Sequence, residues 1–143
     1  VQNKDHVVIL TEMVHDARIV PLNKSQHLSA DIGQWTGDSR GYWEGDTLVV
    51  ETRNFNGLTN TFSNTGSSEK KRLVEKFTRI ANDRIDYEFT IHDPATFTDK
   101  IVGLIPIYKV AGLLYEYACH EGNYAVPNTI SAGRAKDRQQ ASN

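Results

Sequence analysis

The sequence predicts an all-β domain whose antiparallel strands follow one another as a meander and close into a lipocalin-like barrel or a sandwich. Three observations support this prediction. Runs rich in β-branched and aromatic residues recur along the chain, polar and apolar side chains alternate within them, and short turn sequences such as EGD and AND separate them. A length of 143 residues matches one domain with its own hydrophobic core.

The N-terminal half predicts three hairpins. HVVILTEMVHDARIVPL contains two strand-like runs on either side of HD, which form a hairpin or one long bent strand that ends at Pro21. YWEGDTLVVETRNF predicts a hairpin with its turn at residues 44–46. LVEKFTRIANDRIDYEFTIHD alternates on both sides of AND and predicts the third hairpin, although a helix beginning at LVEKF and capped by Ser67 or Ser68 is an alternative.

The C-terminal part predicts two further strands and a short helix or tail. KIVGLIPIYKV is followed by an AG turn and by LLYEYACHE, which is expected to be the last long strand, over residues 113–121. SAGRAKDRQQA is weakly helical in character. We expect a single β-rich domain over residues 1–143. Because it starts without methionine, almost directly on a strand, we expect a mature form or the C-terminal domain of a longer precursor.

The charge pattern narrows the class of partner. Sixteen Lys and Arg stand against eighteen Asp and Glu, and the basic residues are scattered along the chain, so nucleic acid is not an expected partner. No apolar run reaches the ~20 residues of a membrane helix, so no membrane partner is expected either. A small molecule or a carbohydrate remains as the expected ligand. An open sheet edge would also allow a homodimer.

The expected last strand carries a concentration of reactive side chains. Period two places Glu116 and His120 on one face, about 13 Å apart, and Glu121 on the other. The adjacent HE pair therefore does not act as one unit in a regular strand, unless a bulge at Gly122 re-aims the side chains. Cys119 lies on the more apolar face and is expected to be a buried structural thiol.

Other strands place charged side chains among aliphatic ones. In a barrel with a polar cavity these side chains would converge, and in a plain barrel they would form the solvated outer face. The set consists of Glu12, Glu51, Arg53, Glu75, Arg79, Glu116 and His120.

The sequence also allows a site for a divalent metal ion, as a weaker alternative to catalysis by side chains alone. The best ligand set combines His15 and His120 with Glu121 or Asp16, but no HExxH or CxxC spacing supports it. His27 and His92 are expected to be ordinary surface residues. GDSRG matches the GxSxG pattern in letters only, and a turn in which Asp38 and Ser39 accept hydrogen bonds from backbone amides is the better interpretation.

Several long blocks, including GDSRGYWEGDTLVVETRNF and YEYACHEGNY, together resemble a family of exported bacterial proteins without an established activity. The resemblance covers nearly the whole chain. It implies an extracytoplasmic setting, periplasmic or secreted, and a β-rich C-terminal domain. The blocks are rich in charged and aromatic residues, which core packing alone does not require, so they predict a site.

Within that site we assign candidate acid/base roles. His120 is a general acid/base or a metal ligand, Glu116 or Glu121 is its orienting carboxylate or a second base, and Tyr117 or Tyr124 is a proton donor. The candidate substrate-binding residues supply three kinds of group: cationic guanidinium groups, an aromatic ring that can stack on a sugar, and a side-chain amide. They are Arg18, Arg40, Arg53, Trp43 and Asn123.

Two classes of function follow. The first is a small secreted enzyme, a lyase, hydrolase or isomerase, that acts on a sugar or a small aromatic compound by acid/base chemistry, with or without a metal ion. The second is a non-catalytic, lipocalin-like protein that binds a small molecule with the same polar residues.

Overall fold

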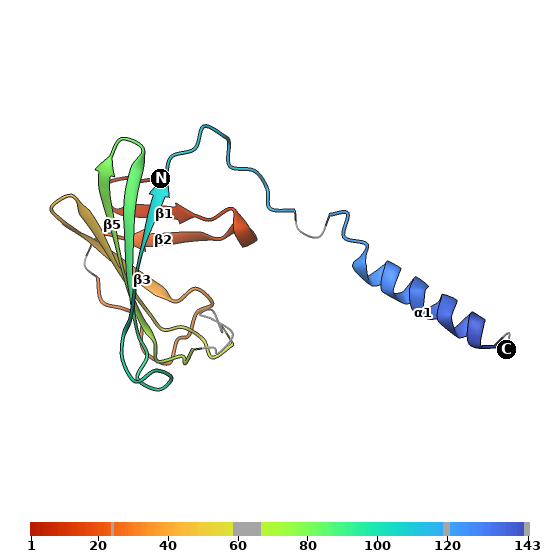
Figure 1. The fold of residues 1–143 in the computed structure, drawn as a ribbon. Coiled ribbons are helices and arrows are strands. Elements are labelled where there is room, and N and C mark those ends of the chain that lie inside the picture. Colours follow the sequence, from red (N-terminus) through yellow and green to blue (C-terminus); the bar gives the residue numbers. More distant parts are fainter. Residues whose placement is uncertain (24, 59–66, 119–120, 142–143) are drawn as a thin grey trace.

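The structure is a computed structural model that describes residues 1–23, 25–58, 67–118 and 121–141. It contains two antiparallel sheets and one C-terminal helix (Figure 1). The smaller sheet pairs β1 (His6–Leu10) with β2 (Ala17–Pro21), joined through a short 3-10 helix, η1 (Met13–His15). The larger sheet has five strands in chain order: β3 (Asp38–Glu44), β4 (Thr47–Arg53), β5 (Arg72–Ala81), β6 (Arg84–His92) and β7 (Ile101–Tyr108).

The larger sheet confirms the predicted β-rich meander. Each of its strands pairs with the next along the chain, and β3 and β7 form its two edges among the described residues. The closed barrel and the sandwich are therefore not confirmed. Pro106 lies in β7, where the lack of a backbone N–H suits an edge strand.

The three predicted hairpins are confirmed. The β3–β4 turn contains Gly45 with a φ of 58°, a left-handed conformation that glycine adopts without steric cost. The alternative helix at LVEKF is wrong, because this segment lies in β5 and pairs with β4 on one side and β6 on the other. Cross-strand pairs on both sides outweigh the local capping signal.

The β1–β2 hairpin packs on one face of the larger sheet, which we call the inner face. Figure 1 shows the hairpin lying across the sheet. Val20 is fully buried and forms the core with Leu48 and Val50 of β4. The hairpin can approach because β3 presents Gly41 there: a Cβ at this position would lie 2.7 Å from Val20 Cγ1. The core is therefore centred on β4 and the hairpin.

A buried ion pair also links the hairpin to the inner face. Arg18 of β2 donates two hydrogen bonds to Glu75 of β5, at 2.7 and 2.9 Å, and Glu75 is 3% exposed. The Tyr87 hydroxyl donates to the same carboxylate at 2.9 Å. Burial and the nearby Glu75 charge raise the pKa of Tyr87, so the phenol keeps its proton and serves as a donor.

The chain leaves the sheet after β7. The strand predicted over residues 113–121 is wrong for its described part, because residues 113–118 form no strand and Leu113 and Tyr115 are exposed. Strand propensity needs a pairing partner, and no described strand pairs with this segment. The helix prediction is confirmed in kind but α1 (Ala125–Ala141) begins earlier than predicted and has no buried residues. None of the described helices is long and apolar enough to cross a membrane.

Candidate functional site

The most organised polar cluster of the structure joins the loop before β3 to the first residues of that strand. Asp38 is 6% exposed. Its Oδ2 lies 2.9 Å from His27 Nδ1 and accepts a hydrogen bond from the Leu28 backbone N–H at 3.0 Å. Its Oδ1 accepts a short hydrogen bond from Arg40 Nη1. We call His27, Asp38 and Arg40 the His27 cluster.

The charges and hydrogen bonds of the His27 cluster determine which atoms of Asp38 and His27 carry a proton. Burial raises the pKa of Asp38, but the hydrogen bonds from Leu28 and His27 and the charge of Arg40 outweigh burial and hold this pKa below its usual value. The carboxylate is therefore ionised at neutral pH and only accepts hydrogen bonds. A neutral His27 must then carry its proton on Nδ1, which leaves the Nε2 lone pair available as a base.

The lowered pKa predicts how stability depends on pH. An Asp in an unfolded chain has a pKa of ~3.9, and the pKa of Asp38 in the folded protein is lower. The contribution of Asp38 to stability is therefore present above about pH 4 and is lost as the pH falls through the folded pKa. We expect the free energy of unfolding, measured with urea between pH 2 and 7, to fall less steeply with decreasing pH in Asp38→Asn than in the wild type. An equally steep loss in this variant would contradict the assigned role of Asp38.

His27 borders a hollow of about 340 Å³ on the outer face of the sheet, the face opposite the β1–β2 hairpin. The other residues lining it are Ser25, Arg40, Gly41, Tyr42 and Glu51. Burial, with the charges of Glu44 and Glu51, raises the pKa of Tyr42, so this phenol also keeps its proton. A candidate base, a candidate proton donor and a carboxylate therefore share one hollow.

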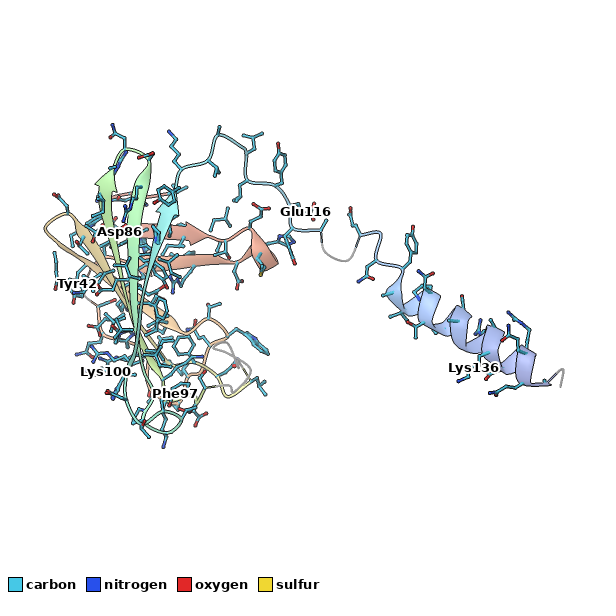
Figure 2. The ribbon with its side chains drawn as sticks, in the orientation of Figure 1. Tyr42, Asp86, Phe97, Lys100, Glu116 and Lys136 are labelled. Carbon is cyan, nitrogen blue, oxygen red and sulfur yellow. The ribbon has the colours of Figure 1, made fainter. Side chains whose placement is uncertain are left out.

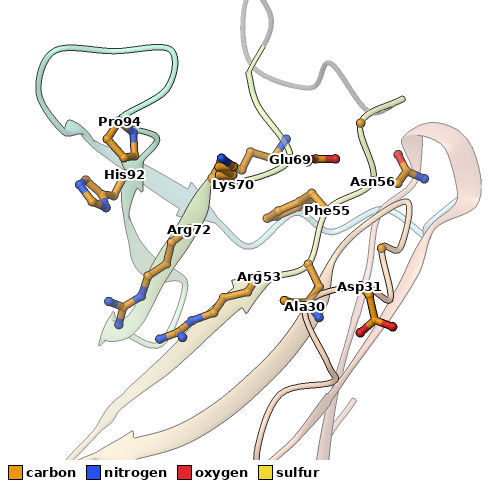
Figure 3. A pocket seen from close by; sticks show the side chains of 14 residues that line it. Ala30, Asp31, Arg53, Phe55, Asn56, Glu69, Lys70, Arg72, His92 and Pro94 are labelled. Atoms are coloured by element: carbon orange, nitrogen blue, oxygen red, sulfur yellow. The ribbon is translucent and has the colours of Figure 1, made fainter.

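Figure 3 shows a second, larger groove of about 870 Å³, lined by residues at the end of β4 and the start of β5. Glu51 connects the two, because its Oε2 accepts hydrogen bonds from Arg53 Nη2 at 3.3 Å and from Arg72 Nη2 at 2.8 Å, and both arginines line the groove. Lys71 also lines it, is 5% exposed and donates to Ser67 Oγ at 2.9 Å. The outer face thus carries a continuous polar surface from β3 to β5.

The structure does not gather the predicted acid/base residues on the sheet. Glu116 lies on the exposed segment that leads from the sheet to α1 (Figure 2), and Tyr117, Glu121 and Tyr124 lie further along it. His120 and Cys119 lie outside the described residues, so their roles stay predictions. No group of three or more metal-ligating side chains occurs in the part of the chain that is described, where His15 is an exposed residue of η1.

The predicted substrate-binding residues are distributed over several places. Arg40 belongs to the His27 cluster and Arg53 lines the groove, whereas Arg18 is engaged with Glu75 on the opposite face. Asn123 Oδ1 accepts a hydrogen bond from the Ala125 N–H at the start of α1. Trp43 is half-exposed near the end of β3.

Of the two alternatives for the seven charged residues, a single polar cavity is not formed by those that are described. Strand register places Glu75 on the inner face and Glu51 and Arg53 on the outer face, because Val50 pairs with Glu75 and the side chains alternate. Glu12 lies exposed next to η1, and Arg79 Nε donates to the Ala81 carbonyl near the end of β5. An open sheet separates what a closed barrel would bring together.

Sequence reasoning missed His27, whose side chain is only 18% exposed. It pairs with a residue eleven positions away, across a loop without periodicity, so no spacing signal pointed to it. The turn predicted at GDSRG is wrong, since Asp38 begins β3, but the predicted backbone hydrogen bond to the Asp38 carboxylate is confirmed. Ser39 instead pairs with Thr52, hydroxyl to hydroxyl, at 2.9 Å. His92 is exposed, as predicted.

Comparison of the chain with models of protein families, curated proteins and solved structures gives no match. The described residues form an antiparallel meander that carries an imidazole–carboxylate pair on its outer face.

Proposed function

We propose that this protein is a small acid/base enzyme that acts on a sugar or a small aromatic compound as a lyase, hydrolase or isomerase. The observation that supports the proposal is the hydrogen bond between His27 Nδ1 and the buried Asp38, next to a hollow that His27 lines. A carboxylate that orients an imidazole and stabilises its protonated form is the arrangement that makes histidine an effective general base. The extracytoplasmic setting remains part of the proposal.

The proposed roles follow from the geometry of the hollow. In the lyase form, His27 Nε2 removes a proton from a substrate carbon. The electron pair of that C–H bond forms a C=C bond, and the neighbouring C–O bond breaks. Tyr42, which keeps its proton, donates it to the leaving oxygen. Arg40 holds Asp38 ionised throughout, so the imidazolium that forms is stabilised.

A substitution of His27 tests the proposal. We expect His27→Gln to reduce turnover of the best substrate in a panel of saccharides and aryl glycosides by about 10²- to 10⁴-fold, the usual contribution of a general base. His6→Gln, in β1 on the side of the sheet opposite the hollow, is the matched control and should leave turnover unchanged.

Two outcomes would overturn this assignment. Equal turnover in the wild type and His27→Gln would exclude His27 as the base. Loss of turnover in His120→Ala but not in His27→Gln would place the chemistry on the C-terminal segment, with the alternative set of Glu116, Tyr117, Glu121 and Tyr124.

A second candidate function, non-catalytic binding of a small apolar molecule, is favoured by a separate hollow on the inner face. This hollow of about 390 Å³ is lined mainly by apolar side chains, among them Leu73, Phe89 and Ile105. A binding protein of this kind should lose its affinity for an anilinonaphthalene probe in Ile105→Asp but not in Leu104→Asp, whose side chain lies on the opposite face. Equal probe binding by both variants would exclude the hollow.

A further inference from the structure

The large groove at the end of β4 and the start of β5, which Arg53 and Arg72 line from the outer face, differs in charge from the rest of the chain. Four of its lining side chains are cationic and two are carboxylates, whereas the whole chain has a formal net charge of -2. The cations are Arg53, Lys70, Lys71 and Arg72, and the carboxylates are Asp31 and Glu69. A concave surface of locally positive charge on a weakly acidic protein attracts anions selectively.

Two of these cations share a single counter-ion. Glu51 Oε2 accepts from both Arg53 Nη2 and Arg72 Nη2, so one negative charge balances two guanidinium groups. Figure 3 shows both guanidinium groups pointing the same way, with Asp31 and Glu69 further away across the groove. Lys71, in contrast, is already engaged with Ser67 and lies 4.2 Å from the centre of the Phe55 ring. Arg53 and Arg72 together therefore carry one positive charge more than Glu51 balances.

Arg72 also has an unused donor. Its Nε atom is buried and has no hydrogen-bond partner among the described residues. A buried donor without a partner is costly, and an oxygen that reaches it recovers that cost. A planar guanidinium presents its N–H groups in a fork that matches a carboxylate in two-point contact.

We propose that Arg53 and Arg72 bind the carboxylate of an acidic sugar, a uronate. One negative charge restores neutrality at the pair of guanidinium groups, which favours a single carboxylate of the ligand at this point. This inference rests on the proposed acid/base function and names the substrate class of the same outer-face site. Glu51, which pairs with both arginines, also lines the hollow beside His27, so the proposal requires a sugar that extends from the two arginines past Glu51 into that hollow.

The assignment has a chemical consequence. A proton on the carbon next to a carboxylate is easier to remove when cations neutralise the carboxylate, because the negative charge that develops on its oxygens is stabilised.

The test compares the binding of an acidic and a neutral sugar. Calorimetric titration with trigalacturonate and with the uncharged galactotriose, at 25 and 200 mM NaCl, should show tighter binding of the acidic sugar, weakened by salt. We expect Arg72→Gln to weaken trigalacturonate binding by about 10-fold or more, in the range of a lost charge-assisted hydrogen bond. The matched control is Lys76→Gln, on the same face of the same strand but outside the groove lining, which should change the affinity less than 2-fold.

Each contrary result has a defined meaning. Equal affinities for the acidic and neutral sugars, or equal effects of Arg72→Gln and Lys76→Gln, would overturn the uronate assignment. Competition by inorganic sulfate as effective as by trigalacturonate would also overturn it, because the groove would then recognise any oxyanion. If a neutral sugar is turned over and His27→Gln abolishes that turnover, the acid/base proposal stands and only the uronate assignment fails.

Discussion

Replacement of Arg18 by methionine is expected to lower the free energy of unfolding by about 3–5 kcal/mol, the usual cost of breaking a buried ion pair by removing one partner. Glu75 is 3% exposed and lies between Val50 and Phe89 in the sheet. Without Arg18 its carboxylate would keep only the hydrogen bond from Tyr87. An unpaired charge in such a place must be either desolvated or neutralised by a proton, and both cost free energy.

Urea unfolding of three variants isolates this effect. Arg84→Met removes one partner of an ion pair with Asp86 whose side chains are 37% and 22% exposed, and this change should cost much less than Arg18→Met. The double variant Arg18→Met/Glu75→Leu removes both charges, so it should recover much of the loss. A cost below 1 kcal/mol for Arg18→Met alone would contradict the view that this pair fastens the hairpin to the sheet.

Truncation of Leu48 to alanine is expected to cost about 2–5 kcal/mol, because it removes buried methyl groups and leaves a cavity. Leu48 is 6% exposed and packs against Val20 of the hairpin and Val50 of its own strand. The core of buried residues is small, so few neighbours can move in to fill the space. The same experiment on Leu104→Ala, at a side chain 58% exposed on β7, should change the free energy by less than about 0.5 kcal/mol. Equal losses in the two variants would show that Leu48 is not a core residue.

The hairpins could be predicted, because both strands of a hairpin lie close together in the sequence. Each hairpin has alternating strands and its turn within about twenty residues, so the local pattern determines both partners. The segment at residues 113–118 has the same alternation but no partner strand in the described chain, and alternation alone cannot reveal that. Closure of the sheet into a barrel or a sandwich is not confirmed, and it could not be judged from local patterns because it depends on contacts between distant strands.

The candidate site was only partly predictable. Arg53 was correctly placed on a strand, on the same face as Glu51, but Arg40 was expected in a turn and lies in β3. Glu75 was expected to line a cavity or to face solvent, whereas it is buried against Arg18, which lies 57 positions away and could not be recognised from local spacing. His27 carried no pattern at all, because a loop residue becomes a candidate base only when Asp38 is folded against it.

A nitrogen-resolved spectrum of the His27 imidazole, assigned with His27→Gln, tests the central claim most directly. If Asp38 orients a base that faces the ligand, neutral His27 will carry its proton on Nδ1, and the Nε2 resonance alone will move strongly when trigalacturonate is added. A proton on Nε2, or ring resonances that do not respond to any saccharide in the panel, would contradict the account.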